Sequence, residues 1–150
     1  MKQKDLPVIP LVTPLDPLPD RRLVMVVDDE APLLSLDEKI LSRENYELIF
    51  AASGEDALEQ IATLDRAPDL LITDYMMPGI TGRELAARVR ERNPDLKVLY
   101  QTGYADRLFG PLEILEPGSS FLEKPFTSRG MREAARLALF GVINPAALTA

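Results

Sequence analysis

The chain has 150 residues, with 24 acidic and 17 basic side chains, a formal net charge of −7, and neither histidine nor cysteine. This composition excludes a disulfide framework, a thiolate metal site and any mechanism that uses histidine as nucleophile, base or phosphoryl carrier. The acidic balance opposes binding to a phosphate backbone, and no apolar run approaches the roughly 20 residues that span a bilayer. We therefore expect a cytoplasmic protein with no nucleic-acid and no membrane partner.

Residues 1–20 differ in composition from the remainder, because they contain five of the thirteen prolines. Proline fixes φ and removes a backbone donor, so this segment is predicted to be an extended, flexible leader. Its aliphatic residues and two Pro-x-x-Pro spacings leave a docking arm open as the alternative. The folded domain is expected over residues 21–141, followed by a C-terminal tail over residues 142–150.

Five short apolar runs follow the leader, and segments with helical periodicity separate them. The runs begin near Leu23, Tyr46, Asp69, Leu96 and Phe121. Five helices are predicted between and after them. Pro32 lies in the first turn of the first helix, and Ser53, Thr81 and Thr127 are the N-caps of the second, third and last. The apolar face of the first helix is predicted to comprise Leu33, Leu36, Ile40 and Leu41. The stretch from 104 to 120 contains Pro111 and Pro117, so a helix there should be short or broken.

Continuous apolar strands that alternate with helices are typical of a parallel sheet covered on both faces. The pattern predicts an α/β fold: a doubly wound, flavodoxin-like, five-stranded parallel sheet in the order 2-1-3-4-5. In that order the first and third strands are neighbours. Ligands bind such sheets at the carboxyl ends of the strands, where the strand order reverses.

Acidic residues occupy the carboxyl ends of these two neighbouring strands. Asp28 and Asp29 end the first strand and Asp74 ends the third. Two carboxylates about 5 Å apart repel by roughly 3 kcal/mol at an effective dielectric near 20, so the cluster needs a compensating charge. Hard oxygen ligands favour Mg²⁺. Lys124 and Thr102 follow the fifth and fourth strands, where an ammonium and a hydroxyl can contact phosphoryl oxygens.

Four segments taken together resemble the response-regulator receiver family over about residues 22–141. They are Val-Asp-Asp-Glu at 27–30, Thr-Asp-Tyr-Met-Met-Pro-Gly at 73–79, Gln-Thr-Gly-Tyr at 101–104 and Phe-Leu-Glu-Lys-Pro-Phe at 121–126. The resemblance implies that Asp74 accepts a phosphoryl group. It implies a Mg²⁺ (or Mn²⁺) site in which Asp29 binds the ion directly, Asp28 holds metal-bound water, and the backbone carbonyl of Met76 is a further ligand.

The resemblance also assigns roles to the remaining motif residues. Thr102 corresponds to the hydroxyl that moves toward the phosphoryl group, Lys124 to the salt-bridging lysine and Phe121 to the aromatic that changes rotamer. Pro125 corresponds to a proline that follows a cis peptide bond. Met76 and Tyr104 flank the approach of the hydrolytic water, and neither is an acid or an amide, so we expect a long-lived phosphorylated state.

The expected function is a phosphoacceptor switch in a two-component or phosphorelay pathway. A histidine kinase or histidine phosphotransfer protein would supply the phosphoryl group, and a downstream protein would bind the switch. Only weak self-catalysed phosphorylation and dephosphorylation are expected, so the chain is not predicted to be a dedicated enzyme. The alternatives are the receiver portion of a hybrid histidine kinase, a Mg²⁺-dependent aspartyl-phosphate hydrolase and a receiver-like module that binds without phosphorylation. For Phe121, an ordinary core aromatic is the competing interpretation.

Overall fold

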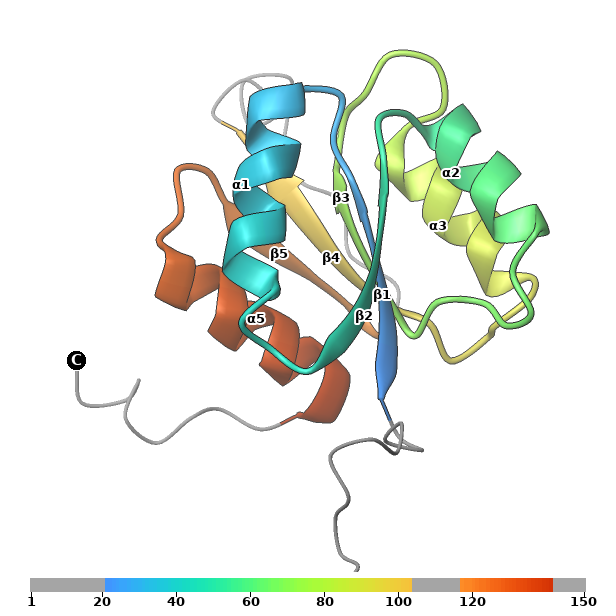
Figure 1. Ribbon diagram of the computed structural model, residues 1–150. Helices are drawn as coiled ribbons and strands as arrows, with labels where there is room; N and C mark the ends of the chain where they lie inside the picture. The colour runs from blue at the N-terminus through green and yellow to red at the C-terminus, as the bar shows by residue number, and fades with distance from the viewer. Residues whose placement is uncertain (1–20, 104–116, 142–150) are drawn as a thin grey trace, which may run out of the picture.

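The computed structural model describes residues 21–103 and 117–141 (Figure 1). Residues 1–20, 104–116 and 142–150 lie outside the described part of the chain. The predicted leader and tail therefore stay predictions, as does the short or broken helix, most of which falls in the second of these ranges.

A single five-stranded sheet forms the centre of the described chain. Its strands are β1 (Arg22–Val27), β2 (Tyr46–Ala51), β3 (Leu70–Asp74), β4 (Lys97–Thr102) and β5 (Ser119–Glu123). They are ordered β2-β1-β3-β4-β5, and every neighbouring pair is parallel. The predicted topology is confirmed, and each strand begins within about two residues of its predicted start.

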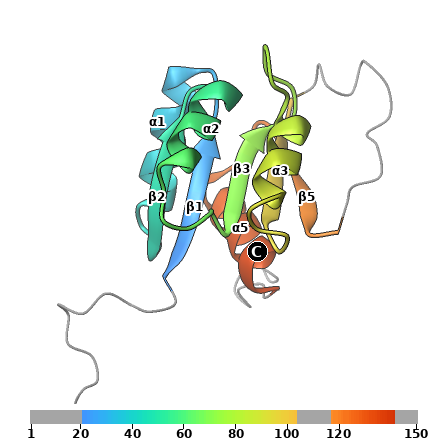
Figure 2. The same cartoon turned by 90° about the vertical axis from the view of Figure 1, so that its right-hand side faces the viewer.

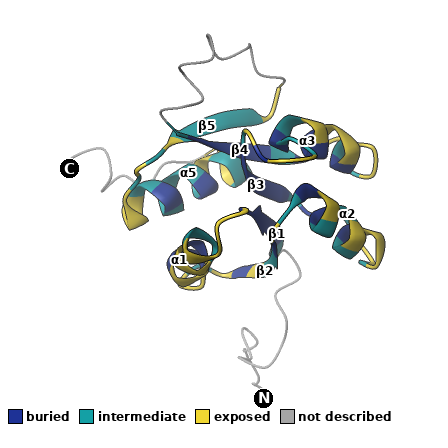
Figure 3. Ribbon diagram, turned by 90° about the horizontal axis from the view of Figure 1, so that it is seen from above, coloured by how far each residue is buried: buried dark blue, intermediate teal, exposed yellow. Residues whose placement is uncertain are grey.

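Two helices cover each face of this sheet. These four helices of the described ranges are α1 (Ala31–Leu41), α2 (Gly54–Ala62), α3 (Gly82–Arg90) and α5 (Ser128–Phe140). Seen from above, α1 and α5 lie on one side of the sheet, and α2 and α3 on the other (Figure 3). Figure 2 faces the side that α2 and α3 cover. The helices turn exposed residues outward and buried residues toward the strands (Figure 3). None of the described helices is long and apolar enough to cross a bilayer.

The helix starts follow the predicted capping chemistry. Ser53 accepts a hydrogen bond from the backbone N–H of Asp56, and Thr127 accepts one from Gly130. Thr81 and Glu84 form a reciprocal capping box. Each cap satisfies backbone donors that the first helical turn leaves without intrahelical partners, so the local sequence determines where these helices begin.

Alternation along the strands produces one core on each face of the sheet. Met25 and Val27 of β1 pack toward α2 and α3, whereas Val24 and Val26 pack toward α1 and α5. In β4, Val98 and Tyr100 belong to the first core and Leu99 to the second. The next residues in this alternation, Asp28 and Gln101, are therefore directed to the face covered by α1 and α5.

The buried face of α1 differs from the predicted one. Leu36 was expected in the core, but it is 43% exposed, and Asp37 is buried instead at 1%. The helix is rotated so that Asp37, Ile40 and Leu41 face the sheet. This set has the 3.6-residue spacing of one helical face, whereas Leu36 falls about 100° away from Asp37.

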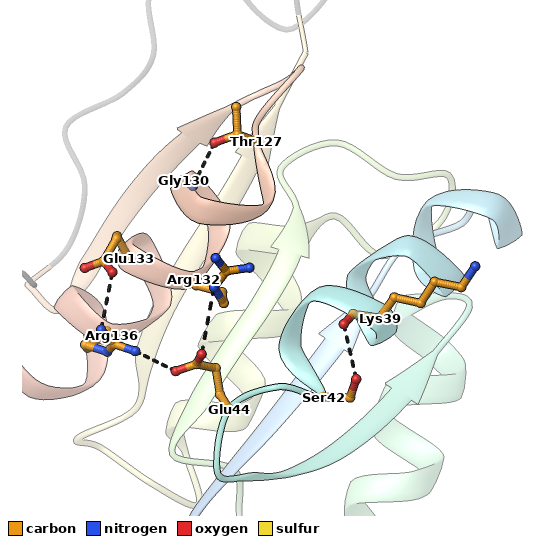
Figure 4. Close-up of polar contacts among 8 residues, drawn as sticks. All are labelled: Lys39, Ser42, Glu44, Thr127, Gly130, Arg132, Glu133 and Arg136. Atoms are coloured by element: carbon orange, nitrogen blue, oxygen red, sulfur yellow. Dashed lines mark hydrogen bonds and ion pairs between the residues drawn. The ribbon is translucent and has the colours of Figure 1, made fainter. Parts of the chain in front are cut away.

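An ion-pair network links the end of α1 to α5 (Figure 4). Glu44, in the loop after α1, lies 2.7 Å from Arg136 and 3.9 Å from Arg132, both on α5. Arg136 also lies 3.3 Å from Glu133 within its own helix. The Glu44 and Arg136 side chains are 16% and 30% exposed, so water screens them only in part and the network holds the two helices together.

Candidate functional site

Three carboxylates meet at the carboxyl ends of β1 and β3. Asp28 is fully buried, Asp74 is 6% exposed and Asp29 is exposed. One oxygen from each lies within 4.8 Å of the others. The parallel pairing of β1 with β3 brings these strand ends together, as the strand order predicted.

Lys124 lies between two of these carboxylates. Its Nζ donates to Asp74 Oδ1 at 2.6 Å and lies 3.6 Å from Asp28 Oδ2. The backbone N–H of Lys124 donates to the Thr102 carbonyl at 2.8 Å, which fixes the start of the loop after β5. The Lys124–Pro125 peptide bond is cis, as the resemblance implied.

The charges in this cluster shift one another's pKa values. Burial raises the pKa of Asp74 to about 7; the Lys124 hydrogen bond opposes this rise, and the charge of Asp28 adds to it. Burial would lower the pKa of Lys124, but its hydrogen bond to Asp74 and the charges of Asp74 and Asp28 outweigh that effect and raise it. Burial, more than repulsion between the carboxylates, therefore disfavours the charged form of Asp74 in the absence of a cation.

The backbone around Asp74 is closely packed against α3. A Cβ atom at Gly82 would lie 2.0 Å from the Asp74 carbonyl oxygen, so only glycine permits this approach. Gly82 N–H donates to the carbonyl of Tyr75 at 3.1 Å. In the connecting loop Met77 is buried, whereas Met76 is 55% exposed beside the cluster.

Thr102 and Phe121 lie next to the cluster on β4 and β5. Thr102 is 1% exposed, and its hydroxyl has no hydrogen-bond partner. The Phe121 ring lies 5.5 Å from the ring of Tyr75 and 5.7 Å from that of Tyr100, between centroids. Phe121 therefore contacts the residue that directly follows Asp74. Tyr104 lies outside the described residues.

Two further polar residues lie beside the cluster. No sequence pattern singles out Asp37, and Gln101 enters only as the first residue of the Gln-Thr-Gly-Tyr segment, without a role. Asp37 and Gln101 are each 1% exposed. Gln101 lines a cavity of about 330 Å³ whose polar wall also includes Asp28 and Lys124. Its apolar wall comprises Leu33, Leu36, Pro125 and Phe126. The phase of α1, which places residue 37 with Ile40 and Leu41, was the signal that could have revealed Asp37.

The residues present fit a divalent cation. The donors are carboxylate oxygens, and the chain has no cysteine or histidine to offer a thiolate or an imidazole, so the site has the chemistry that Mg²⁺ and Mn²⁺ prefer. Asp28 Oδ2 is buried and has no hydrogen-bond partner, although Lys124 Nζ is 3.6 Å away. An orphaned carboxylate oxygen beside two more carboxylates indicates a site built for positive charge.

Residues 24–136 match the family model of the response regulator receiver domain. The chain belongs to this receiver family. It is therefore a receiver domain of two-component signalling, a class of module that acts as a switch between histidine kinases and downstream targets rather than as a dedicated enzyme.

Curated relatives share the domain within longer proteins. The receiver domain is 34% identical over 107 residues to the alkaline phosphatase synthesis transcriptional regulatory protein PhoP of Bacillus subtilis, covering 71% of this chain and 43% of PhoP. It is 32% identical over 104 residues to the sensor kinase CckA of Brucella abortus, covering 69% of this chain and 11% of the kinase. The chain thus matches less than half the length of these relatives.

Solved receiver structures have the same fold. A response regulator receiver protein from Sinorhizobium medicae is 28% identical with a TM-score of 0.64, covering 80% of this chain and 95% of that chain. The receiver domain from the hybrid histidine kinase CckA is 30% identical with a TM-score of 0.61, covering 78% and 98% respectively.

Proposed function

We propose that this receiver domain accepts a phosphoryl group on Asp74 from a histidine kinase or histidine phosphotransfer protein, and then signals by contact with a downstream protein. The convergence of Asp28, Asp29 and Asp74 beside Lys124 carries the proposal. Family membership supports it, because receivers are switches of two-component systems. The relation to CckA favours a phosphohistidine donor in either a free or a kinase-linked context.

The transfer forms one bond and breaks one. A carboxylate oxygen of Asp74 attacks phosphorus, the bond from phosphorus to the donor's histidine nitrogen breaks, and its electron pair returns to the imidazole. The product is an acyl phosphate on Asp74. Lys124 donates to Asp74 Oδ1 at 2.6 Å, so it orients the nucleophile and then neutralises a phosphoryl oxygen.

Mg²⁺ or Mn²⁺ would be held by Asp29, Asp74, the Met76 carbonyl and, through water, Asp28; when bound it neutralises charge on the phosphoryl oxygens. Asp29 is the exposed member, so it is reachable from solvent without movement of the core. The backbone N–H of Glu30 donates to Asp28 Oδ1 at 2.9 Å, and this hydrogen bond fixes the Asp28 carboxylate.

The output step uses Thr102 and Phe121. The unpartnered Thr102 hydroxyl donates to a phosphoryl oxygen, which draws the end of β4 toward the site. Phe121 pairs with Tyr100 across the β4–β5 register and contacts Tyr75, so it responds to a shift of either strand end. The downstream protein would bind the β4–β5 side of the domain, where the end of β4 and the Phe121 side chain have shifted.

Phosphorylation by acetyl phosphate with Mg²⁺ tests the proposal. Mass spectrometry of the intact protein should detect one added phosphoryl group in the wild type and none in Asp74→Asn. Equal labelling of Asp74→Asn would reject Asp74 as the acceptor. Fast release of phosphate over many turnovers, with no acyl phosphate accumulating on Asp74, would instead support the Mg²⁺-dependent hydrolase alternative.

The metal requirement is tested with Asp29→Ala. Isothermal titration with Mg²⁺ should detect binding at least tenfold weaker than that of the wild type, since a direct carboxylate ligand is lost. Because Asp29 is exposed, its removal should leave the melting temperature of the metal-free domain unchanged or raised. Unaltered Mg²⁺ affinity would contradict the ligand assignment.

A further inference from the structure

Unpartnered buried polar atoms gather at one place in the described part of the chain. Six such side-chain atoms occur there, and five of them belong to Asp28, Asp37, Gln101 and Thr102. Asp28 and Thr102 are explained by the proposed cation and phosphoryl group. Asp37 and Gln101 have no part in that chemistry, yet both are 1% exposed. Burial of polar groups without partners opposes folding, so their presence calls for a function.

Gln101 lies beside the proposed acceptor. In the β3–β4 register Gln101 is paired with Asp74, and the Tyr75 N–H donates to the Gln101 carbonyl at 3.0 Å. Paired residues of neighbouring parallel strands direct their side chains to the same face, about 5 Å apart. The Gln101 side chain also lines the same cavity as Asp28 and Lys124. It therefore lies beside Asp74 and shares a cavity wall with Asp28 and Lys124.

Asp37 approaches Gln101 from α1. The Gln101 amide is close enough to favour the charged form of Asp37, although no geometrically complete hydrogen bond joins the two groups. The charge of Asp28 acts on Asp37 in the opposite direction, which places a fourth carboxylate within electrostatic reach of the cluster. The charged groups that act on Asp37 are Asp28, directly after β1, and Lys124, directly after β5.

A purely structural role does not account for this pair. Exchange of two buried polar partners for apolar groups of similar shape is usually neutral or stabilising. Leu99 and Leu122, on the strand positions around Gln101, show that this face otherwise contains apolar side chains. A carboxylate and an amide beside the acidic cluster instead resemble the outer groups that orient a metal's ligands and strengthen them as donors.

We propose that Asp37 and Gln101 form a second polar layer that positions the acidic cluster and strengthens its hold on the divalent cation. Gln101 is a positioning residue for Asp28 and Asp74. Asp37 lies within electrostatic reach of the Gln101 amide and of Asp28, and it adds negative charge beside the site. This role rests on the proposed function, because it presupposes that the cluster binds Mg²⁺.

Mg²⁺ titration of purified variants tests the layer. Asp37→Asn and Gln101→Met should each bind Mg²⁺ about tenfold more weakly than the wild type at pH 8, the usual effect of removing an outer partner of a metal ligand. Asp95→Asn is the matched control. It also removes one negative charge, but Asp95 is exposed in the turn before β4, at the opposite end of that strand, and should leave the affinity unchanged.

The double variant D37L/Q101M separates positioning from packing. It should melt at or above the wild-type temperature, because positions 37 and 101 then carry no buried polar group without a partner, and yet bind Mg²⁺ as weakly as the single variants. Recovery of wild-type affinity in this variant would overturn the proposal, as would single variants that bind within twofold of the wild type. A wild type that neither binds Mg²⁺ nor accepts phosphate would instead reject the proposed function itself.

Discussion

Lys124 Nζ lies 2.6 Å from Asp74 Oδ1, so the lysine ammonium directly neutralises the buried carboxylate at the end of β3. The lysine side chain is 22% exposed and that of Asp74 8%, so the pair is only partly screened by water. Removal of one member of such a pair leaves the other charge buried.

Lys124→Met should destabilise the metal-free domain by about 1–3 kcal/mol at pH 8. The loss should be smaller at pH 6, because Asp74 has a raised pKa and becomes neutral there without its partner. Urea denaturation at the two pH values measures the difference. A loss that is equal at both would contradict the view that an unpaired Asp74 charge is its cause.

Asp37 should make the stability of the metal-free domain depend on pH in an unusual direction. Its pKa is raised from 3.8 to about 7, first by burial and then by the charge of Asp28. Between these values the folded state binds more protons than the unfolded state. The contribution of Asp37 to stability is therefore fully present below about pH 3.8 and is lost as the pH rises through about 7.

The Asp37→Asn variant isolates this effect, because Asp74 titrates in both proteins. Relative to the wild type, the variant should gain stability between pH 5 and pH 8, by an amount on the order of a few kcal/mol. Urea denaturation in the presence of EDTA at several pH values provides the comparison. Parallel stability curves for the two proteins would show that Asp37 does not titrate in this range.

Gly82→Ala should disturb the acceptor strand directly. The added Cβ would meet the Asp74 carbonyl oxygen at 2.0 Å, and neither α3 nor β3 can yield without loss of packing. We expect destabilisation of about 2–3 kcal/mol, the upper part of the usual range for overpacking. Gly130→Ala in the first turn of α5 is the control, since its Cβ would only approach the Thr127 hydroxyl oxygen at 3.1 Å. If both variants lose similar stability, the cause is an alanine in the first turn of a helix and not the clash with the Asp74 carbonyl.

Met76 should prolong the phosphorylated state. Its side chain is 55% exposed, two residues after Asp74, and its thioether is too weak an acceptor to orient a hydrolytic water. The acyl phosphate should then persist well beyond seconds, and Met76→Asn should shorten its lifetime because an amide can hold the water. The decay of phosphoprotein after removal of acetyl phosphate is the measurement. Decay of the wild type within seconds, or no acceleration in Met76→Asn, would reject this explanation.

Local patterns in the sequence were sufficient for the fold and for much of the candidate site. Apolar strand runs and the caps at Ser53, Thr81 and Thr127 depend on residues that are close in the sequence, so the sequence alone predicts them. The order of parallel strands then brought Asp28, Asp29 and Asp74 together. Lys124 followed for the same reason, since each of these residues ends a strand or lies just after its end.

Tertiary structure decided which polar residues lie inside. Leu36 and Asp37 are adjacent on α1, and only the rotation of the helix against the sheet makes the leucine exposed and the aspartate buried. Gln101 became significant only through its register with Asp74 and its nearness to Asp37, which join three separate elements. Side-chain hydrophobicity alone predicts that Leu36 is buried and Asp37 exposed, the reverse of what the structure shows. Packing across the sheet prevailed because a helix buries one face as a unit and cannot exchange a single residue between its faces.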